Sequence, residues 1–278
     1  MYGSRNGTLT DHVPREKIAQ MARIGIVGAM TEEISLLEKE LGETRRQRRG
    51  MREYAEGSLY GFDAVLVFSR WGKVAAASTA TTLLDVYDVK LIIFTGVAGA
   101  VAEDLEIGDV VIGDRLIQHD LDASALPGLK PHEVPLLRRS EFQAKRRFVD
   151  LAAEAAHRYL TATLPADVPH EVLSEFTLSP PKVRRGLIVS GDQFVADPET
   201  LAQLRMDLPD AQCVEMEGAA IAQVCYEHNV PAVVIRTISD KADHSAVIDF
   251  PRFVHEVASH FSRGILREFL AQLTLNDY

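Results

Sequence analysis

Cysteine is scarce in this sequence, where Cys213 and Cys225 are the two cysteines among 278 residues. They supply neither a disulfide framework nor a CxxC metal site. Long apolar runs are also missing, because the longest mainly apolar stretch, Leu91–Ala102, is shorter than the roughly 20 residues that span a bilayer. Positive charge is in deficit, with 30 Lys and Arg against 40 Asp and Glu and a net charge of −10. These shortages argue against a disulfide-rich protein, a membrane-spanning protein, and nucleic acid or an anionic membrane as the main partner.

Several common motifs of nucleotide-binding proteins and hydrolases are absent as well. The sequence contains no P-loop GxxxxGK[ST] and no GxSxG, and Gly25 with Gly28 does not complete a GxGxxG. His119, Asp120 and Asp122 offer at most three metal ligands, with no second cluster near them in the sequence. We therefore predict neither a dinucleotide cofactor nor a metal.

The length of the chain suffices for one sizeable core, since a chain of this size buries roughly 70–75% of its unfolded surface. Residues 1–22 are polar and aperiodic, and they lack the apolar run of a secretory signal. We predict a loosely attached leader over residues 1–22 and one α/β domain over residues 23–275. With no targeting or membrane segment, we expect a soluble, cytoplasmic protein.

Short apolar runs alternate with helical patterns from Arg23 onward. The runs are nearly continuous, which is typical of strands covered on both faces. The predicted strands are Ile24–Gly28, Ala64–Ser69, Leu91–Thr95, Asp109–Gly113, Gly186–Ser190 and Ala232–Ile238. The predicted helices are Glu32–Leu41, Lys73–Tyr87, Glu141–Leu160, Pro198–Met206, Glu215–His228 and Phe253–Leu273, with irregular loops at Ala123–Pro135 and Thr161–Arg185. This order predicts an α/β fold with a central mixed, largely parallel sheet flanked by helices.

The segments that follow the strands are the first places to look for chemistry, because ligands of open α/β sheets gather at the carboxyl ends of strands. Glu32 and Glu33 follow the first strand, where acids also simply complement the dipole of a helix. The run Thr95–Ala100 contains small residues, which suit either a close approach of the backbone to a ligand or tight packing.

Charged residues in apolar surroundings mark two further strand ends. Glu215 and Glu217 open an apolar helix, where a carboxylate must be paired or hydrogen-bonded, and sugar hydroxyls are suitable donors. Arg236 lies in a predicted central strand that runs into Ser239–Asp243. Either Arg236 forms an ion pair with an acid of that segment, or it serves a ligand site.

Taken together, these segments resemble one family. The matching pieces, in order, are Ile24-Gly25-Ile26-Val27-Gly28-Ala29-Met30-x-Glu32-Glu33, Gly72-Lys73-Val74-Ala75-Ala76-Ala77, Thr95-Gly96-x-Ala98-Gly99, His119-Asp120-x-Asp122, Gly186-Leu187-Ile188-Val189-Ser190-Gly191-Asp192-x-Phe194, Val214-Glu215-Met216-Glu217 and Arg236-x-Ile238-Ser239-Asp240-x-Ala242-Asp243. The set resembles the 5′-methylthioadenosine/S-adenosylhomocysteine nucleosidases of the purine nucleoside phosphorylase-like superfamily, and it spreads over about residues 22–270. Each piece alone is weak, but the ordered set is specific.

The resemblance implies hydrolysis of the N-glycosidic bond between adenine and a 5′-substituted ribose, with no cofactor. It implies that Glu33 orients or deprotonates the attacking water and that Asp240, held by Ser239, protonates adenine N7. It implies that Glu217 binds the ribose hydroxyls with Arg236 and Met216 beside it, and that Phe194 and the backbone of Val195 hold adenine. The substrate-binding set implied in full is Trp71, Val97, Ala98, Gly99, Phe194, Val195, Glu215, Met216, Glu217, Arg236, Ser239, Ala242 and Phe250.

The chemistry of the reaction requires such a pair of carboxyl groups. Cleavage passes through an oxocarbenium-like sugar, so the leaving adenine needs a proton from an acid whose pKa is raised by burial. The water side needs an ionised carboxylate, which also stabilises the cationic sugar. The two groups must therefore hold opposite protonation states.

Three positions depart from the family pattern, all toward the ribose and the 5′ group. Val97 stands where the family usually has Ser or Thr, and Trp71 where it has a smaller aliphatic residue. The family forms homodimers in which a loop, here Ala123–Pro127, reaches the neighbouring site, and this loop lacks the family's aromatic residue. The identity of the 5′ group is therefore open: alternatives are a nucleosidase of the 5′-deoxyadenosine or futalosine type, a purine nucleoside phosphorylase, and a catalytically silent nucleoside-binding protein.

Overall fold

The computed structural model describes residues 23–176 and 181–274, so the predicted leader over residues 1–22 lies outside the described residues. The strands are β1 (Ile24–Gly28), β2 (Gly42–Arg49), β3 (Arg52–Leu59), β4 (Phe62–Phe68), β5 (Leu91–Ala100), β6 (Val110–Gln118), β7 (Glu141–Gln143), β8 (Val183–Ser190), β9 (Ala211–Glu215) and β10 (Ala232–Asp240). The helices are α2 (Thr31–Glu40), α3 (Lys73–Asp85), α4 (Arg146–Arg158), α5 (Leu164–Asp167), α6 (His170–Phe176), α7 (Pro198–Asp207), α8 (Gly218–Glu227), α9 (Ala246–Phe253) and α10 (Ser259–Gln272), with π-helical turns at Tyr159–Thr163 and Val254–Ala258.

The sheet contains two blocks of parallel strands, to which β2, β3 and β7 add antiparallel pairs. In one block, β4, β1, β5 and β10 run parallel, and in the other, β6, β8 and β9 run parallel. Antiparallel pairs join the blocks at β10–β6 and β5–β9, so that β5, β10, β6, β8 and β9 pair in a closed circuit. The predicted mixed α/β fold is confirmed, while the closure of the sheet onto itself is a feature that strand patterns alone did not indicate.

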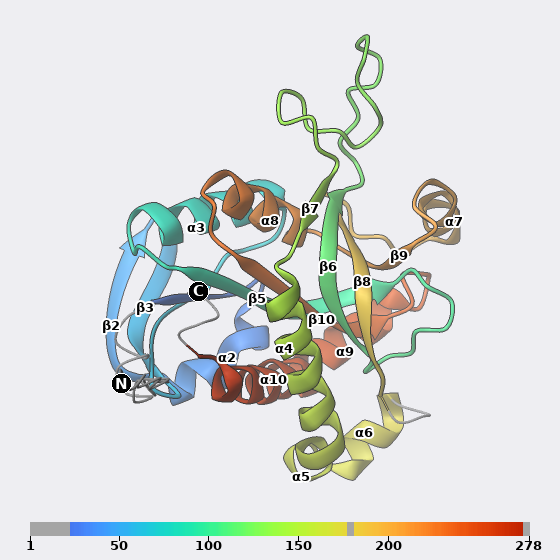
Figure 1. Cartoon of the computed structure of the whole chain (residues 1–278). Coiled ribbons are helices and arrows are strands. Elements are labelled where there is room, and N and C mark those ends of the chain that lie inside the picture. The colour runs from blue at the N-terminus through green and yellow to red at the C-terminus, as the bar shows by residue number, and fades with distance from the viewer. Residues whose placement is uncertain (1–22, 177–180, 275–278) are drawn as a thin grey trace, which may run out of the picture.

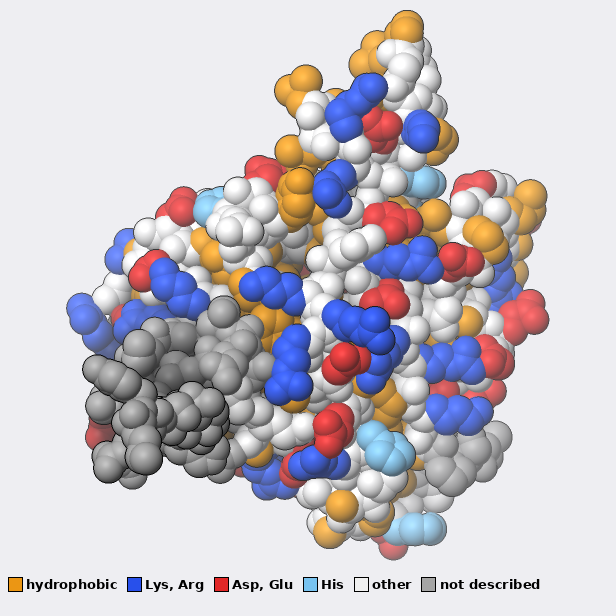
Figure 2. Space-filling model, viewed as in Figure 1, with side chains coloured by type: hydrophobic (Ala, Val, Ile, Leu, Met, Phe, Trp, Pro, Cys, Tyr) orange, Lys and Arg blue, Asp and Glu red, His pale blue; other side chains and the backbone are white. Residues whose placement is uncertain are grey.

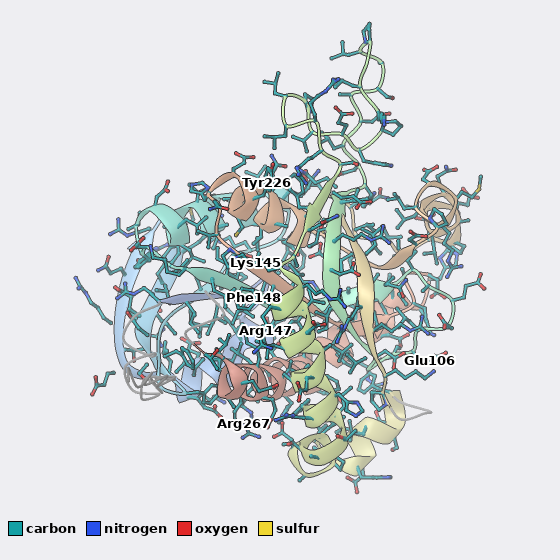
Figure 3. All side chains as sticks on the ribbon, viewed as in Figure 1. Glu106, Lys145, Arg147, Phe148, Tyr226 and Arg267 are labelled. Atoms are coloured by element: carbon teal, nitrogen blue, oxygen red, sulfur yellow. The ribbon has the colours of Figure 1, made fainter. Side chains whose placement is uncertain are left out.

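Helices cover both faces of the sheet (Figure 1). One face carries α2, α4 and α10, whose apolar residues form one core cluster with the strands, and the other carries α3 and α8. On α4, Phe148 is fully buried and packs against Phe269 of α10 with ring centroids 6.5 Å apart (Figure 3). Strands such as β1, with every residue buried, are apolar throughout because helices shield both of their faces.

Several predicted boundaries are wrong. The helix predicted from Glu141 begins at Arg146, because Glu141–Gln143 pairs with β6 as β7. The helix predicted from Glu215 begins at Gly218, because Ala211–Glu215 is β9. The loop predicted at Thr161–Arg185 contains α5 and α6, and its Pro165 and Pro169 lie at or just before helix starts, where proline is well tolerated.

Residues 121–140, between β6 and β7, form an arm that projects from the body of the protein (Figures 1 and 2). The predicted irregular loop at Ala123–Pro135 lies within it. Tyr226 of α8 (labelled in Figure 3) anchors its base, because the Arg139 guanidinium lies 4.7 Å from the Tyr226 ring centroid. The arm carries apolar residues toward solvent, with Leu136 96% exposed. In the described part of the chain, no helix combines the length and apolar character needed to cross a membrane.

Candidate active site

A cavity of about 390 Å³ opens where the carboxyl ends of strands from both parallel blocks meet. Its walls come from the ends of β5, β9 and β10, from the segments after β1, β4 and β8, and from α9. The lining residues are Ala29, Met30, Glu33, Trp71, Val97, Ala98, Gly99, Gln193, Phe194, Val195, Val214, Glu215, Met216, Glu217, Ser239, Asp240, Val247, Phe250 and Pro251. The position agrees with the expectation that ligands bind at the carboxyl ends of strands.

Glu33 reaches the cavity from the first turn of α2 and is 2% exposed. Its Oε2 accepts hydrogen bonds from the backbone N–H groups of Ala29 (2.7 Å) and Met30 (2.9 Å), and its Oε1 accepts one from Val97 (3.0 Å). Burial raises the pKa of Glu33, while the charge of Arg236 and these three N–H groups oppose the rise. The same carboxylate therefore closes the start of α2 and faces the cavity.

Asp240 lies at the end of β10 and is also 2% exposed. Its Oδ2 accepts a hydrogen bond from the Ser239 hydroxyl at 2.8 Å, and its Oδ1 accepts one from the Ala242 N–H at 2.8 Å. Burial raises the pKa of Asp240 against these hydrogen bonds, and the carboxylates of Asp249 and Asp243 add to the rise. Asp240 is thus a buried acid with an enhanced affinity for its proton.

Two glycines of β5 leave room for these carboxyl groups. A Cβ on Gly96 would lie 2.4 Å from Glu33 Oε1, and a Cβ on Gly99 would lie 2.9 Å from Asp240 Oδ1. The sequence offered close approach to a ligand or tight packing as the reason for the small residues of this run. At Gly96 and Gly99 the reason is tight packing, because the carboxyl groups of Glu33 and Asp240 lie against them. Gly96 and Gly99 are three residues apart, so the two carboxyl groups pack against different positions of the same strand.

Glu215, which lines the cavity, forms a buried ion pair with Arg236, which does not. Arg236 Nη2 lies 2.6 Å from Glu215 Oε2, and the guanidinium stacks 3.8 Å from the Phe94 ring centroid. Glu215 also accepts hydrogen bonds from Ser190 and from the backbone N–H of Gly218. The sequence left open an ion pair of Arg236 with an acid of Ser239–Asp243 or a role in a ligand site. Its partner is instead Glu215 of β9, and Arg236 itself does not line the cavity.

Glu217 faces the cavity with fewer partners. Its Oε1 accepts a hydrogen bond from the Gly72 N–H at 2.8 Å. Burial and the neighbouring Glu215 carboxylate raise the pKa of Glu217 to about 8, against the opposing effects of Gly72 and Arg236. Since this carboxyl group keeps bonding capacity directed at the cavity, it is suited to hold hydroxyl groups of a ligand.

Aromatic and aliphatic side chains form the mouth. Phe194 and Phe250 meet edge to face with centroids 5.3 Å apart, Val195 lies buried beside them, and Met216 completes this wall. Trp71 is 61% exposed and Val247 is 65% exposed, although both line the cavity. The mouth is therefore apolar and open on one side.

Most of the residues singled out from the sequence line this one cavity. Arg236 and Ala242 do not: each instead bonds to a carboxylate that does. Sequence reasoning missed Ala29, Met30, Gln193, Val214, Val247 and Pro251 as lining residues. Met30 and Gln193 lie within the quoted motif segments, whereas Val247 and Pro251 give no sequence signal. No group of three or more His, Cys, Asp or Glu in the described ranges is arranged to hold a metal ion.

Comparison with known proteins yields consistent matches. The phosphorylase superfamily matches residues 23–271. The chain is 38% identical over 244 residues to the 5′-methylthioadenosine/S-adenosylhomocysteine nucleosidase of Haemophilus influenzae (strain PittEE), covering 88% of this chain and 97% of that protein. The structure of the Neisseria meningitidis nucleosidase in complex with methylthio-immucillin-A is similar, with a TM-score of 0.80 and 32% identity over 91% of this chain and 100% of that chain. Futalosine hydrolase of Helicobacter pylori strain 26695 is also similar, with a TM-score of 0.78 and 30% identity over 91% and 99% of the two chains.

Proposed function

This chain belongs to the 5′-methylthioadenosine/S-adenosylhomocysteine nucleosidase family of the phosphorylase superfamily, and from that premise we propose how its cavity performs the reaction. The family predicted from the sequence motifs is confirmed. The chain is an N-glycosyl hydrolase that releases adenine from 5′-methylthioadenosine and S-adenosylhomocysteine. The observation that carries the mechanism is the pair of buried carboxyl groups, Glu33 and Asp240, in one cavity beside the same strand.

Asp240 is the general acid in this proposal. The raised pKa of Asp240 favours its protonated form, and that proton passes to adenine N7 as the bond between N9 and C1′ breaks. The Ser239 hydroxyl donates to Asp240 Oδ2 at 2.8 Å and lies 3.4 Å from the Ala98 carbonyl oxygen, so Ser239 holds the carboxyl group while the proton of Asp240 stays available for N7. Ser239 therefore serves as a positioning residue that orients the acid.

Glu33 is the base that activates the attacking water in this proposal. Its hydrogen bonds from three backbone N–H groups stabilise the ionised form, while burial keeps the carboxylate basic enough to accept a proton. As the water oxygen bonds to C1′, Glu33 takes its proton, and its negative charge stabilises the cationic sugar. Glu33 and Asp240 pack against different glycines of β5, so the two carboxyl groups occupy separate positions at the cavity, which suits the separate roles of base and acid.

The remaining lining residues divide between the ribose and the base. Glu217 accepts hydrogen bonds from the ribose hydroxyls, and Met216 packs beside it. Phe194 stacks on adenine, and the backbone of Val195 pairs with the edge of the base. Arg236 and Ala242 do not contact the substrate in this proposal. Arg236 positions Glu215 and the Ala242 N–H positions Asp240, each through a hydrogen bond.

The composition of the cavity wall favours an uncharged 5′ group. Among the described lining residues the ionisable ones are carboxyl groups, and none is Lys or Arg. The homocysteine tail carries a carboxylate beside its ammonium group, and the lining residues offer that carboxylate no cation to pair with. We therefore propose 5′-methylthioadenosine as the preferred substrate, with Trp71 and Phe250 against the methylthio group.

The experiment is adenine release from a panel of 5′-substituted adenosines, with and without phosphate. The panel holds 5′-methylthioadenosine, S-adenosylhomocysteine, 5′-deoxyadenosine and futalosine, so it separates the nucleosidase alternatives. We expect the highest kcat/KM with the methylthio substrate, free methylthioribose as the sugar product, and no effect of phosphate. Formation of a sugar 1-phosphate would instead identify a phosphorylase, and binding without adenine release a silent nucleoside-binding protein.

The arm supports a homodimer in which Ala123–Pro127 closes the 5′ end of the partner's site. Leu126 is exposed on the arm, and symmetric pairs are the commonest oligomers. Sedimentation should show a dimer, and specific activity should fall on dilution below its dissociation constant. A fully active monomer would remove this role for the arm. The cytoplasmic location stays a prediction.

A further inference from the structure

The start of α3 lacks a capping side chain of its own. Its N-cap is Gly72, whose φ of 89° lies in the left-handed region and which has no side chain to accept a hydrogen bond. Two distant carboxylates bind the free N–H groups at this helix start. Glu217 Oε1 accepts from the Gly72 N–H at 2.8 Å, and Asp192 Oδ1 accepts from the Lys73 N–H at 2.8 Å. The helix start is therefore held by one residue of the cavity and one residue outside it.

Asp192 is itself held in a closed circuit. The Asp192 N–H donates to Asp120 Oδ2 at 2.9 Å, and the Lys73 ammonium donates to Asp120 Oδ1 at 2.5 Å. The Asp192 carboxylate completes the circuit by accepting from the Lys73 backbone. Burial acts to raise the pKa of Asp120, but Lys73 and the Asp192 N–H outweigh it and hold the pKa below its ordinary value. Asp120 thus stays ionised and bonded.

The circuit joins two walls of the cavity. On one side, Asp192 precedes Gln193, Phe194 and Val195, the wall assigned to adenine. On the other side, Lys73 follows Trp71 and Gly72, of which Trp71 lines the mouth and Gly72 bonds to Glu217. The His119-Asp120 motif, for which the sequence predicted no metal, has a structural role here through Asp120.

We propose that Asp192 is a positioning residue that fixes the start of α3, and with it Trp71 and the Gly72 N–H that orients Glu217 toward the ribose. This proposal rests on the assignment of Glu217 to the ribose hydroxyls. Asp192 does not line the cavity, so it acts through Gly72 and Lys73.

The test compares Asp192→Ala with Asp192→Asn. The alanine variant loses the acceptor for the Lys73 N–H but keeps its own backbone bond to Asp120, so only the α3 side is released. We expect KM for 5′-methylthioadenosine to rise about tenfold, the scale of one lost hydrogen bond to a charged group, with kcat and the inhibition constant of adenine little changed. Asp192→Asn retains an acceptor oxygen and should restore KM.

Two further variants separate positioning from general destabilisation. Asp197→Ala removes a carboxylate that accepts the Thr200 N–H at the start of α7, and it should leave KM unchanged. Asp120→Ala releases both walls, so it should weaken nucleoside and adenine binding together. Trp71, the single tryptophan, should change its emission in Asp192→Ala and keep it in Asp197→Ala.

Three results would overturn the proposal: an unchanged KM in Asp192→Ala, equal losses in Asp192→Ala and Asp197→Ala, or an asparagine variant as impaired as the alanine variant. A wild-type protein that releases no adenine would instead contradict the proposed function itself. The two failures are therefore distinguishable.

Discussion

The inner half of the cavity and its mouth differ in how they are held. Inside, Glu33 and Asp240 are almost fully buried, and each accepts hydrogen bonds from groups of this chain. At the mouth, Trp71, Phe194 and Val247 are exposed apolar side chains. The difference indicates that this chain holds the two buried acids through its own hydrogen bonds, whereas the side chains at the mouth are less constrained.

The strongest test of this division is Glu33→Gln. The amide cannot accept the proton of the water, so we expect kcat to fall by about a thousandfold, within the usual range for loss of acid–base catalysis. Glu32→Gln is the matched control, because Glu32 is the exposed neighbour in the same helical turn and should retain activity. Measured turnover of adenine release decides the point, and comparable activities in the two variants would contradict the role of Glu33.

Asp240→Asn should have the next largest effect. Asparagine keeps the shape but has no proton to transfer to N7, so we expect kcat to fall about a hundredfold or more with substrate binding largely retained. Asp197→Asn serves as the control, since Asp197 accepts the Thr200 N–H at the start of α7 and does not line the cavity. Near wild-type turnover in Asp240→Asn would show that another group protonates adenine.

Glu217 gives the inner half a predictable dependence on pH. Its pKa is raised from 4.5 to about 8 in the folded protein, so folding favours the protonated form. Its contribution therefore stabilises the protein at low pH and is lost as the pH rises from about 4.5 through about 8. The glutamine of Glu217→Gln mimics the protonated group, so the Tm of the wild type should fall more between pH 5 and pH 8.5 than the Tm of this variant. Thermal unfolding measures both values, and a difference in Tm between them that does not grow with pH contradicts the assignment.

Trp71→Ile should have the smallest effect and should be confined to the mouth. The bulky indole occupies part of the mouth, and isoleucine in its place leaves more room for the long homocysteine tail, so we expect the preference for the methylthio substrate over S-adenosylhomocysteine to shrink by about fivefold, the equivalent of about 1 kcal/mol. Val74→Ala, at an exposed position of the same helix start that does not line the cavity, should change nothing. Kinetics with both substrates provide the measurement, and an unchanged ranking in Trp71→Ile would place this residue outside substrate selection.

The inner half of the site could be predicted from the sequence more accurately than the edge strands of the fold. Strands such as β1 are recognisable in the sequence as apolar runs, because both of their faces are buried. Since the ends of these strands could be predicted, the acids that directly follow them could be predicted as site residues too. By contrast, β2 and β3 were not predicted. The residues of β2, which include four arginines, are largely exposed, and its pairing with β3 is made by backbone groups that any sequence offers.

Contacts between residues that are distant in the sequence also could not be predicted. Arg236 was recognised as unusual, but its partner Glu215 lies on β9, a strand that was taken for part of a helix. The extension of β5 through Gly96 and Gly99 was missed because glycine lowers strand propensity, and its reason, the space needed by Glu33 and Asp240, exists only in the folded protein.

The closed circuit of β5, β10, β6, β8 and β9 has a consequence for the order in which the protein folds. Closure pairs Gly99 with Val214 and Ile92 with Ala232, contacts that are distant in sequence and therefore slow to form. Glu33, Glu217 and Asp240 come together only when β9 and β10 have joined β5. A chain in which β10 has not yet joined the sheet does not have Asp240 in the cavity. We therefore expect no partly active folding intermediate, and we expect activity to appear when β9 and β10 have joined the sheet.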